Sequence, residues 1–118
     1  MIDEGDVALT PLPQADGRSK NRPVLVLRRM PPFGDLLVCG ISTQLQQAVD
    51  DFDEVIDPTD ADFATSGLKA ASLIRLGYLA VLPERSFLGR IGTAAAERRS
   101  RLLEKLCRHL APAPIDQP

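Results

Sequence analysis

The chain has 118 residues and a formal net charge of −2; 44% of its residues are hydrophobic and 4% are aromatic. This length suits one domain, whose core must be built mainly from Val, Leu, Ile and Ala. No run of about 18 apolar residues predicts a transmembrane helix, and the acidic start MIDEGD lacks the pattern of a signal peptide. We therefore expect a cytoplasmic protein without a membrane segment, with one domain over residues 1–110 and a Pro-rich disordered tail over 111–118.

The charges are unevenly distributed along the chain. One stretch is basic and contains no acid: Arg18, Lys20, Arg22, Arg28 and Arg29. Another is acidic and contains no base: Asp50, Asp51, Asp53, Glu54, Asp57, Asp60 and Asp62. The acidic pI of the whole chain argues against a nucleic-acid-binding protein, but a local basic patch can still bind phosphate, because charges more than about 10 Å apart are largely screened. We interpret the acidic stretch as a solvated face.

The first half of the chain predicts three strands. Residues 5–12 form the first and end in prolines; residues 14–21, QADGRSKN, have the composition of a loop. The unbroken apolar run at 22–27, RPVLVL, predicts a strand buried on both faces. A turn at 30–35 leads to the apolar strand 36–41, in which Gly40 indicates a bend or a close backbone approach. Connections this short predict antiparallel neighbours.

The middle of the chain is less regular. Residues 44–50 are ambiguous, whereas FDEVI at 52–56 alternates apolar and acidic side chains as a half-buried strand does. Thr59 or Asp60 is the expected N-cap of a helical turn over 61–65, which Gly67 ends.

The last part of the chain predicts a long strand, a short strand and a helix. Residues 71–82 form one strand, or two with a kink, with a bulge at Gly77; 87–91 form the last strand. Period-two counting places one set of side chains on a common face: Ser72, Ile74, Leu76, Tyr78 and Ala80. Thr93 then caps a helix that runs to about Leu110. Its apolar stripe is Leu102, Leu103, Leu106 and Leu110. Its expected water-facing side chains are Arg98, Arg99, Arg101, Lys105 and Arg108.

Five or six short antiparallel strands followed by one helix predict a mainly β (α+β) fold. A small β-barrel is the expected architecture, because closing a sheet removes edge strands that would otherwise aggregate. Cys39 and Cys107 lie in apolar stretches and are interpreted as two buried free thiols. Two cysteines and one histidine have no recognisable zinc-ligand spacing, so neither a metal nor a cofactor is expected.

Three polar features are candidates for chemistry. The first is the polar loop that directly precedes Arg22-Pro23 at the start of the buried strand. The second is Ser42-Thr43-Gln44 at the end of strand 36–41. The third is Ser66-Gly67-Leu68-Lys69, followed by Ser72 and Arg75. An arginine fork matches a phosphate with two hydrogen bonds, and a hydroxyl beside it can orient the phosphoryl oxygen. If the two strands are neighbours, Arg22 and either Ser42 or Thr43 share one pocket.

This arrangement lacks an obvious proton acceptor. A guanidinium has a pKa above about 12 and is a poor general base at neutral pH. His109 is interpreted as a helix C-terminal residue favoured by the helix dipole, so a group in the loop 18–21 or in a partner subunit would have to assist. The plainer alternatives are a surface arginine at Arg22 and a polar strand end at Ser42-Thr43-Gln44.

Taken in order, these segments resemble the MazF/PemK family of toxins. The matching segments are Gly5-Asp6-Val7, Arg22-Pro23-Val24-Leu25-Val26-Leu27, Ile41-Ser42-Thr43-Gln44, Phe52-Asp53-Glu54-Val55 and Gly89-Arg90-Ile91-Gly92. The likeness extends to about Leu110. Two features depart from the family pattern: Ser42 stands where a threonine is usual, and the first loop is short and lacks the usual Gly-Ser-Glu-Gln pattern.

The resemblance implies an SH3-like barrel with a C-terminal helix, and a homodimer that cuts single-stranded RNA (mRNA) without a metal ion. It also implies control by a cognate antitoxin, with operator DNA bound only as a complex with that antitoxin. In this hypothesis Arg22 is catalytic, and Ser42 or Thr43 positions the phosphate. The RNA-binding residues would be Arg18, Ser19, Lys20, Asn21 and Gln44.

Two other hypotheses remain open. A catalytically weakened member of the same family would act by binding an antitoxin or nucleic acid. An unrelated barrel could bind peptides, but that requires an exposed aromatic groove, and four Phe, one Tyr and no Trp supply little material for it.

Overall fold

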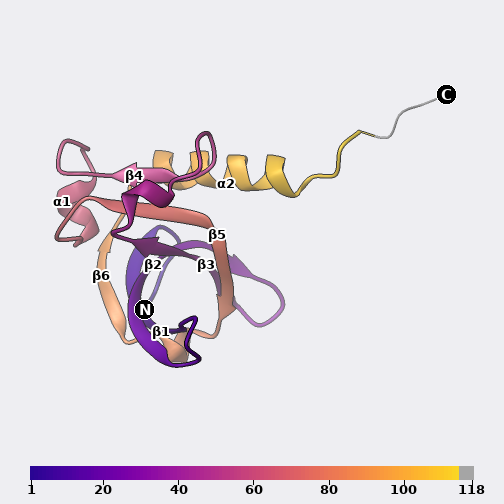
Figure 1. Cartoon of the computed structure of the whole chain (residues 1–118). Coiled ribbons are helices and arrows are strands. Elements are labelled where there is room, and N and C mark those ends of the chain that lie inside the picture. Colours follow the sequence, from indigo (N-terminus) through magenta and orange to yellow (C-terminus); the bar gives the residue numbers. More distant parts are fainter. Residues whose placement is uncertain (115–118) are drawn as a thin grey trace.

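One antiparallel sheet makes up most of the structure, a computed structural model that describes residues 1–114. Its six strands follow the order β4-β5-β3-β2-β1-β6. Their bounds are β1 Asp6–Pro13, β2 Ser19–Met30, β3 Asp35–Ser42, β4 Glu54–Ile56, β5 Ser72–Leu82 and β6 Gly89–Thr93. The sheet curls into a half-barrel, and helix α2 (Ala96–Leu110) lies across one end of it (Figure 1). The predicted mainly β fold with a C-terminal helix is confirmed.

Strand β2 is buried on both faces, as its apolar run predicted. Its alternate side chains enter two separate cores. Leu25 and Leu27 pack in the core that includes Leu102 and Leu106 of α2. Val24 and Val26 pack in the second core, with side chains of β1 and β3. Burial on both faces explains why this strand has no polar alternation.

Strand β5 contains the bulge predicted at Gly77. Cys39 of β3 pairs with Leu79, but the next residue, Gly40, pairs with Arg75, so residues 76–78 have no partner on β3. The bulge bends β5 and changes which side chains share a face. Leu76 is buried in the core beneath α2, whereas Tyr78 packs against the other core. Period-two counting through the bulge was therefore wrong from Tyr78 onward.

The barrel is left open between its two edge strands, β4 and β6. The short helix α1 (Phe63–Ser66) packs there directly on the backbone of β6. A Cβ at Gly67 would lie 2.1 Å from the Ile91 carbonyl oxygen, and one at Gly92 would lie 2.3 Å from the Ser66 carbonyl carbon. Both positions need glycine, because no side chain fits so close an approach.

Helix α2 begins later than predicted. Thr93 is not its N-cap: it ends β6, and its Oγ1 donates a hydrogen bond to the Gly5 carbonyl oxygen at 3.2 Å. The N-cap is Ala95, whose N–H is bound by the Asp62 carboxylate at 2.9 Å. Asp62 also precedes α1 as its N-cap residue, in place of Thr59 or Asp60.

The prediction that Arg98 faces water was wrong. Arg98 is 6% exposed and donates two hydrogen bonds to Asp62, at 2.8 and 3.0 Å, and one to Glu54 at 2.9 Å. Hydrogen bonds from Arg98, opposed by burial, hold the pKa of Asp62 below its usual range. Burial also opposes ionisation of Glu54, but Arg101 and Lys105 hold its pKa below the usual range. The acidic stretch is therefore not simply a solvated face, because these two carboxylates anchor α2.

The last turns of α2 extend beyond the sheet (Figure 1). Cys107 is exposed, so the prediction that it is a buried thiol was wrong. Leu110, the last residue of the predicted apolar stripe, is 66% exposed. Cys39 is buried as predicted, and burial together with the Asp53 carboxylate raises the pKa of its thiol to about 12. Within residues 1–114, no helix is long and apolar enough to cross a membrane.

Other boundaries differ by a few residues. Ser19–Asn21, expected in a loop, begin β2 and pair with Pro11–Pro13. The ambiguous segment 44–50 contains the 3-10 helix Leu45–Gln47, and a second 3-10 helix spans Glu84–Ser86. Of the expected tail, residues 111–114 are exposed and carry no helix or strand, and 115–118 lie outside the described residues.

Candidate functional site

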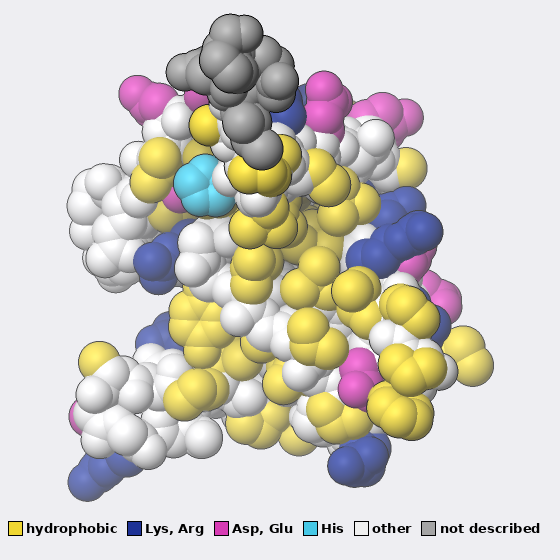
Figure 2. Space-filling view, turned by 90° about the vertical axis from the view of Figure 1, so that its right-hand side faces the viewer, with side chains coloured by type: hydrophobic (Ala, Val, Ile, Leu, Met, Phe, Trp, Pro, Cys, Tyr) yellow, Lys and Arg dark blue, Asp and Glu magenta, His cyan; other side chains and the backbone are white. Residues whose placement is uncertain are grey.

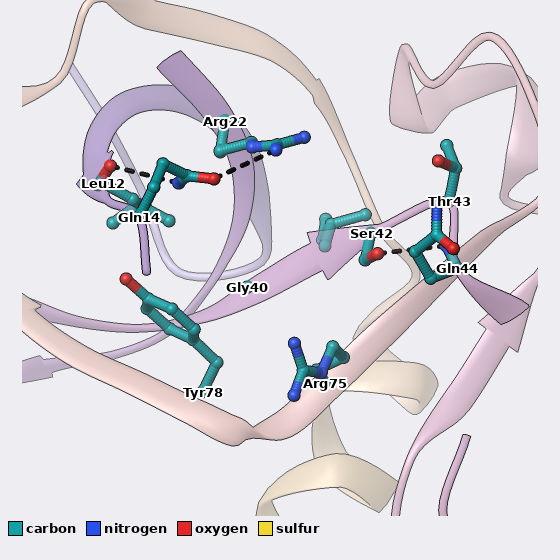
Figure 3. A pocket seen from close by; sticks show the side chains of 10 residues that line it. Leu12, Gln14, Arg22, Gly40, Ser42, Thr43, Gln44, Arg75 and Tyr78 are labelled. Atoms are coloured by element: carbon teal, nitrogen blue, oxygen red, sulfur yellow. Dashed lines mark hydrogen bonds between the residues drawn. The ribbon is translucent and has the colours of Figure 1, made fainter. Parts of the chain in front are cut away.

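A hollow of about 180 Å³ opens where β1, β2, β3 and β5 meet (Figure 3). We call it the arginine pocket. Its lining residues are Leu12, Gln14, Arg22, Gly40, Ile41, Ser42, Thr43, Gln44, Arg75 and Tyr78. The strand register explains why Arg22 and Ser42, two of the predicted site residues, meet in this pocket. Val24 pairs with Gly40 in antiparallel strands, so Arg22, two residues before Val24, and Ser42, two residues after Gly40, lie at the same level of neighbouring strands.

Gln14 fixes the guanidinium of Arg22. The Gln14 side-chain oxygen accepts a hydrogen bond from Arg22 Nη2 at 3.1 Å. The Gln14 amide nitrogen donates to the Leu12 carbonyl oxygen at 3.3 Å, which holds the amide itself in place. Arg22 is half-buried, and among residues 1–114 it forms no ion pair. Its other donors therefore remain available to a ligand in the pocket.

Ser42 ends β3 with its hydroxyl at the pocket. The Ser42 Oγ accepts the backbone N–H of Gln44 at 3.0 Å, which orients the oxygen and leaves the hydroxyl hydrogen free to be donated. Thr43, the neighbouring candidate, is exposed and also lines the pocket. Gln44 is exposed as well, and its side-chain oxygen accepts a hydrogen bond from Gln46 at 2.8 Å.

Strand β5 brings two further side chains to the pocket: Arg75, just before the bulge, and Tyr78, within it. The guanidinium of Arg75 points into the hollow, in the space between Tyr78 and Ser42 (Figure 3). The Tyr78 ring packs on the backbone of β3, where a Cβ at Gly40 would lie 3.4 Å from the ring carbon Cγ. From the sequence, Arg75 was predicted only as part of a polar feature, and Gln14 and Tyr78 were not predicted as site residues. Two glycines could have indicated Tyr78: Gly40 leaves room for its ring, and Gly77 marks the bulge that turns it to this face.

The pocket is positively charged. Two guanidiniums line it, and none of its lining residues carries a carboxylate. It therefore suits an anion with several acceptor oxygens, such as a phosphodiester. It contains no histidine. His109 lies near the C-terminal end of α2, where its ring centroid is 4.9 Å from that of Phe52, and it lines a separate hollow.

Several predicted site residues lie outside the pocket. Arg18, Ser19, Lys20 and Asn21 are exposed on the β1–β2 hairpin, leading to Arg22 along the chain. The feature at Ser66 is structural: Ser66 is buried, and its hydroxyl donates to the Phe63 carbonyl oxygen at 2.6 Å. The Ser72 hydroxyl donates to the Ala70 carbonyl oxygen at 2.8 Å and is likewise turned away from the site.

Comparisons with known proteins agree with this architecture. The solved structure of the Mycobacterium tuberculosis toxin MazF-mt6 is similar, with a TM-score of 0.63 and 23% sequence identity over 87% of this chain and 93% of that chain. At this identity the likeness concerns the fold. A comparison with curated proteins found no match. The family model described as "PemK-like, MazF-like toxin of type II toxin-antitoxin system" matches residues 3–110. Because that match spans most of the sequence, the chain belongs to the PemK/MazF toxin family.

Proposed function

We propose that this protein is an endoribonuclease that cleaves single-stranded RNA, such as messenger RNA. Its family consists of toxins of type II toxin–antitoxin systems and is known for this activity. The observation that carries the proposal is the arginine pocket, in which Arg22, Arg75 and the Ser42 hydroxyl surround one hollow without a carboxylate. That donor set fits a phosphodiester group.

The proposed reaction is attack of a ribose 2′-OH on the adjacent phosphorus. The bond from phosphorus to the 5′-oxygen breaks, leaving a 2′,3′-cyclic phosphate and a 5′-hydroxyl end. Arg22 and Arg75 stabilise the negative charge that builds on the non-bridging oxygens, and no metal ion is required for this role. Ser42 donates a hydrogen bond to one of these oxygens and orients it. The 2′-OH loses its proton and the departing 5′-oxygen gains one; because no lining side chain is a base at neutral pH, we assign both transfers to solvent or to a group outside the pocket.

The surroundings of the pocket supply the remaining RNA contacts. Arg18, Ser19, Lys20 and Asn21 extend from Arg22 along the exposed hairpin, and the exposed Gln44 lines the pocket after the end of β3. Cationic and amide side chains there hold the backbone on either side of the cut. We further propose that the protein acts as a homodimer in the cytoplasm and that a cognate antitoxin inhibits it. Operator DNA would be bound only through that antitoxin.

Replacement of Arg22 tests the proposal. Arg22→Ala removes a positioned donor, so RNA cleavage in the presence of EDTA should fall by about a hundredfold or more. Arg28→Ala is the matched control, because Arg28 lies on the same strand with a 62% exposed side chain. Fragments are quantified on a denaturing gel, and folding is checked by thermal unfolding. Equal cleavage by Arg22→Ala and the wild-type protein would remove the assignment.

A binding-only family member is the second candidate. It is favoured by one feature of the pocket, the lack of a lining side chain that acts as a base at neutral pH. In the same assay this candidate predicts intact RNA whose band is retarded on a native gel. RNA fragments that depend on Arg22 would exclude it.

A further inference from the structure

We infer that a second hollow, next to the arginine pocket, receives a nucleobase of the RNA and stacks it on Tyr78. This inference rests on the proposed function and adds a base-binding subsite to it. We call the hollow the tyrosine groove. It has a volume of about 410 Å³ and lies between the end of β1 and the second half of β5, lined by Pro11, Pro13, Tyr78, Leu79 and Leu82 among others.

The tyrosine groove is built for an uncharged, flat ligand. None of its lining residues carries a charge. Figure 2 shows hydrophobic side chains gathered on the face of the molecule that contains β5, where Leu79 is 38% exposed. The groove offers no cationic side chain to a phosphate. The bases of single-stranded RNA, in contrast, have apolar π faces that proteins bind by stacking on aromatic side chains.

Tyr78 is packed in place at the border between the two hollows. Its ring packs on the bare backbone of Gly40, and its hydroxyl lies 3.4 Å from the Pro13 carbonyl oxygen, so the ring spans from β5 to β1. A stacking partner that is already fixed loses little conformational entropy when a base binds. The β5 bulge is what points this ring away from the core beneath α2.

The groove continues the site already described, which favours RNA over other occupants. Leu12 and Tyr78 line both the arginine pocket and the tyrosine groove. A nucleotide next to a phosphate bound by Arg22 therefore has its base within reach of the groove. A second copy of the chain could also cover exposed apolar side chains such as Leu79, and the experiment below separates these two occupants.

The test measures binding rather than cleavage. The probe is a randomised ten-nucleotide pool of 2′-O-methyl RNA, which lacks the attacking hydroxyl, and a base-free phosphodiester backbone of the same length is the comparison. Tyr78→Leu keeps apolar volume but removes the π face, whereas Tyr78→Phe keeps the face. We expect Tyr78→Leu to weaken binding of the RNA pool by about five- to a hundredfold, and Tyr78→Phe to bind like the wild type. Leu88→Ala, at an exposed leucine outside the groove, is the control.

The base-free backbone identifies the source of any loss. It should bind the wild type and Tyr78→Leu equally, because it offers nothing to stack. Unchanged binding of the RNA pool to Tyr78→Leu, or an equal loss with the base-free backbone, would overturn the subsite. So would a loss that coincides with dissociation of a dimer in sedimentation velocity, which would assign the groove to a subunit interface. Failure of the proposed function shows separately, as cleavage that does not depend on Arg22.

Discussion

Gln14 decides where the guanidinium of Arg22 points. Its amide oxygen accepts from Arg22 at 3.1 Å, and its amide nitrogen donates to the Leu12 carbonyl oxygen at 3.3 Å. A long arginine side chain at a strand end has many rotamers, and holding it in one orientation reduces the entropy lost when a phosphate binds. Gln14 thus acts through Arg22 as a positioning residue.

Replacing Gln14 should affect the chemical step more than RNA binding. Gln14→Met keeps the length of the side chain but removes the acceptor, so we expect the single-turnover cleavage rate at saturating RNA to fall by about tenfold or more, with little change in Kd. Gln47→Met is the control, because Gln47 is exposed and does not line the pocket. A rate equal to that of the wild type would show that Arg22 needs no such support.

The meeting of Arg22 and Ser42 in the pocket could be predicted from the sequence, because it depends only on which strands are neighbours. Arg22 and Ser42 meet because β2 and β3 are joined by a short turn, which the sequence displays. Gln14 depends on the shape of the hairpin turn, and Tyr78 depends on the number of residues in the β5 bulge. One glycine signals that a bulge exists, but its length decides which face the following side chains take.

At the scale of elements, Asp53 connects the β5 bulge to the segment that follows Ser42. Its two carboxylate oxygens accept hydrogen bonds from the backbone N–H groups of Leu76, at 3.0 Å, and Val49, at 2.9 Å. Leu76 lies in the unpaired part of β5, so Asp53 provides the acceptor that β3 does not. Asp53, a residue of the acidic stretch, therefore holds the bulge that contains Tyr78 and follows Arg75.

Asp53→Asn tests this link. An asparagine offers one acceptor oxygen and places an NH₂ group against the second backbone N–H, so we expect a loss of about 1–3 kcal/mol in the free energy of unfolding. Cleavage should fall as well, because Arg75 lies immediately before the bulge and Tyr78 is its last residue. Asp50→Asn, at an exposed neighbour, is the control in urea denaturation. Identical stability of the two variants would mean that the hydrogen bonds of Asp53 to Leu76 and Val49 do not stabilise the fold.

Element boundaries were predictable only where their causes are local. The end of α2 at Leu110 and the turn before β3 follow from neighbouring residues. The start of α2 does not, because the Ala95 N–H is capped by Asp62, 33 positions earlier in the chain. The same carboxylate binds Arg98, so a helical pattern that places arginines on a polar face could not reveal which of them is buried.

At the scale of the whole molecule, Arg98 attaches α2 to the open side of the half-barrel. It is 6% exposed and forms ion pairs with Glu54 of β4 and with Asp60 and Asp62 of the segment between β4 and α1. Removing one partner of such a buried ion pair leaves uncompensated charges. Arg98→Met should therefore lower the free energy of unfolding at pH 7 by about 3–5 kcal/mol. Arg108→Met, at an exposed position of the same helix, should have little effect.

The pH dependence of stability should report the same cluster. The folded-state pKa values of Asp62 and Glu54 lie below their usual range, so their contribution is present above the unfolded-state pKa values, near pH 4. It is lost as pH falls through the lower folded-state values, because the unfolded chain then binds more protons. Urea denaturation between pH 7 and pH 3 should show wild-type stability declining below about pH 4. In Arg98→Met that decline should be shallower, because protonation of the carboxylates then relieves their repulsion. An equal slope in both proteins would locate the acid sensitivity elsewhere in the fold.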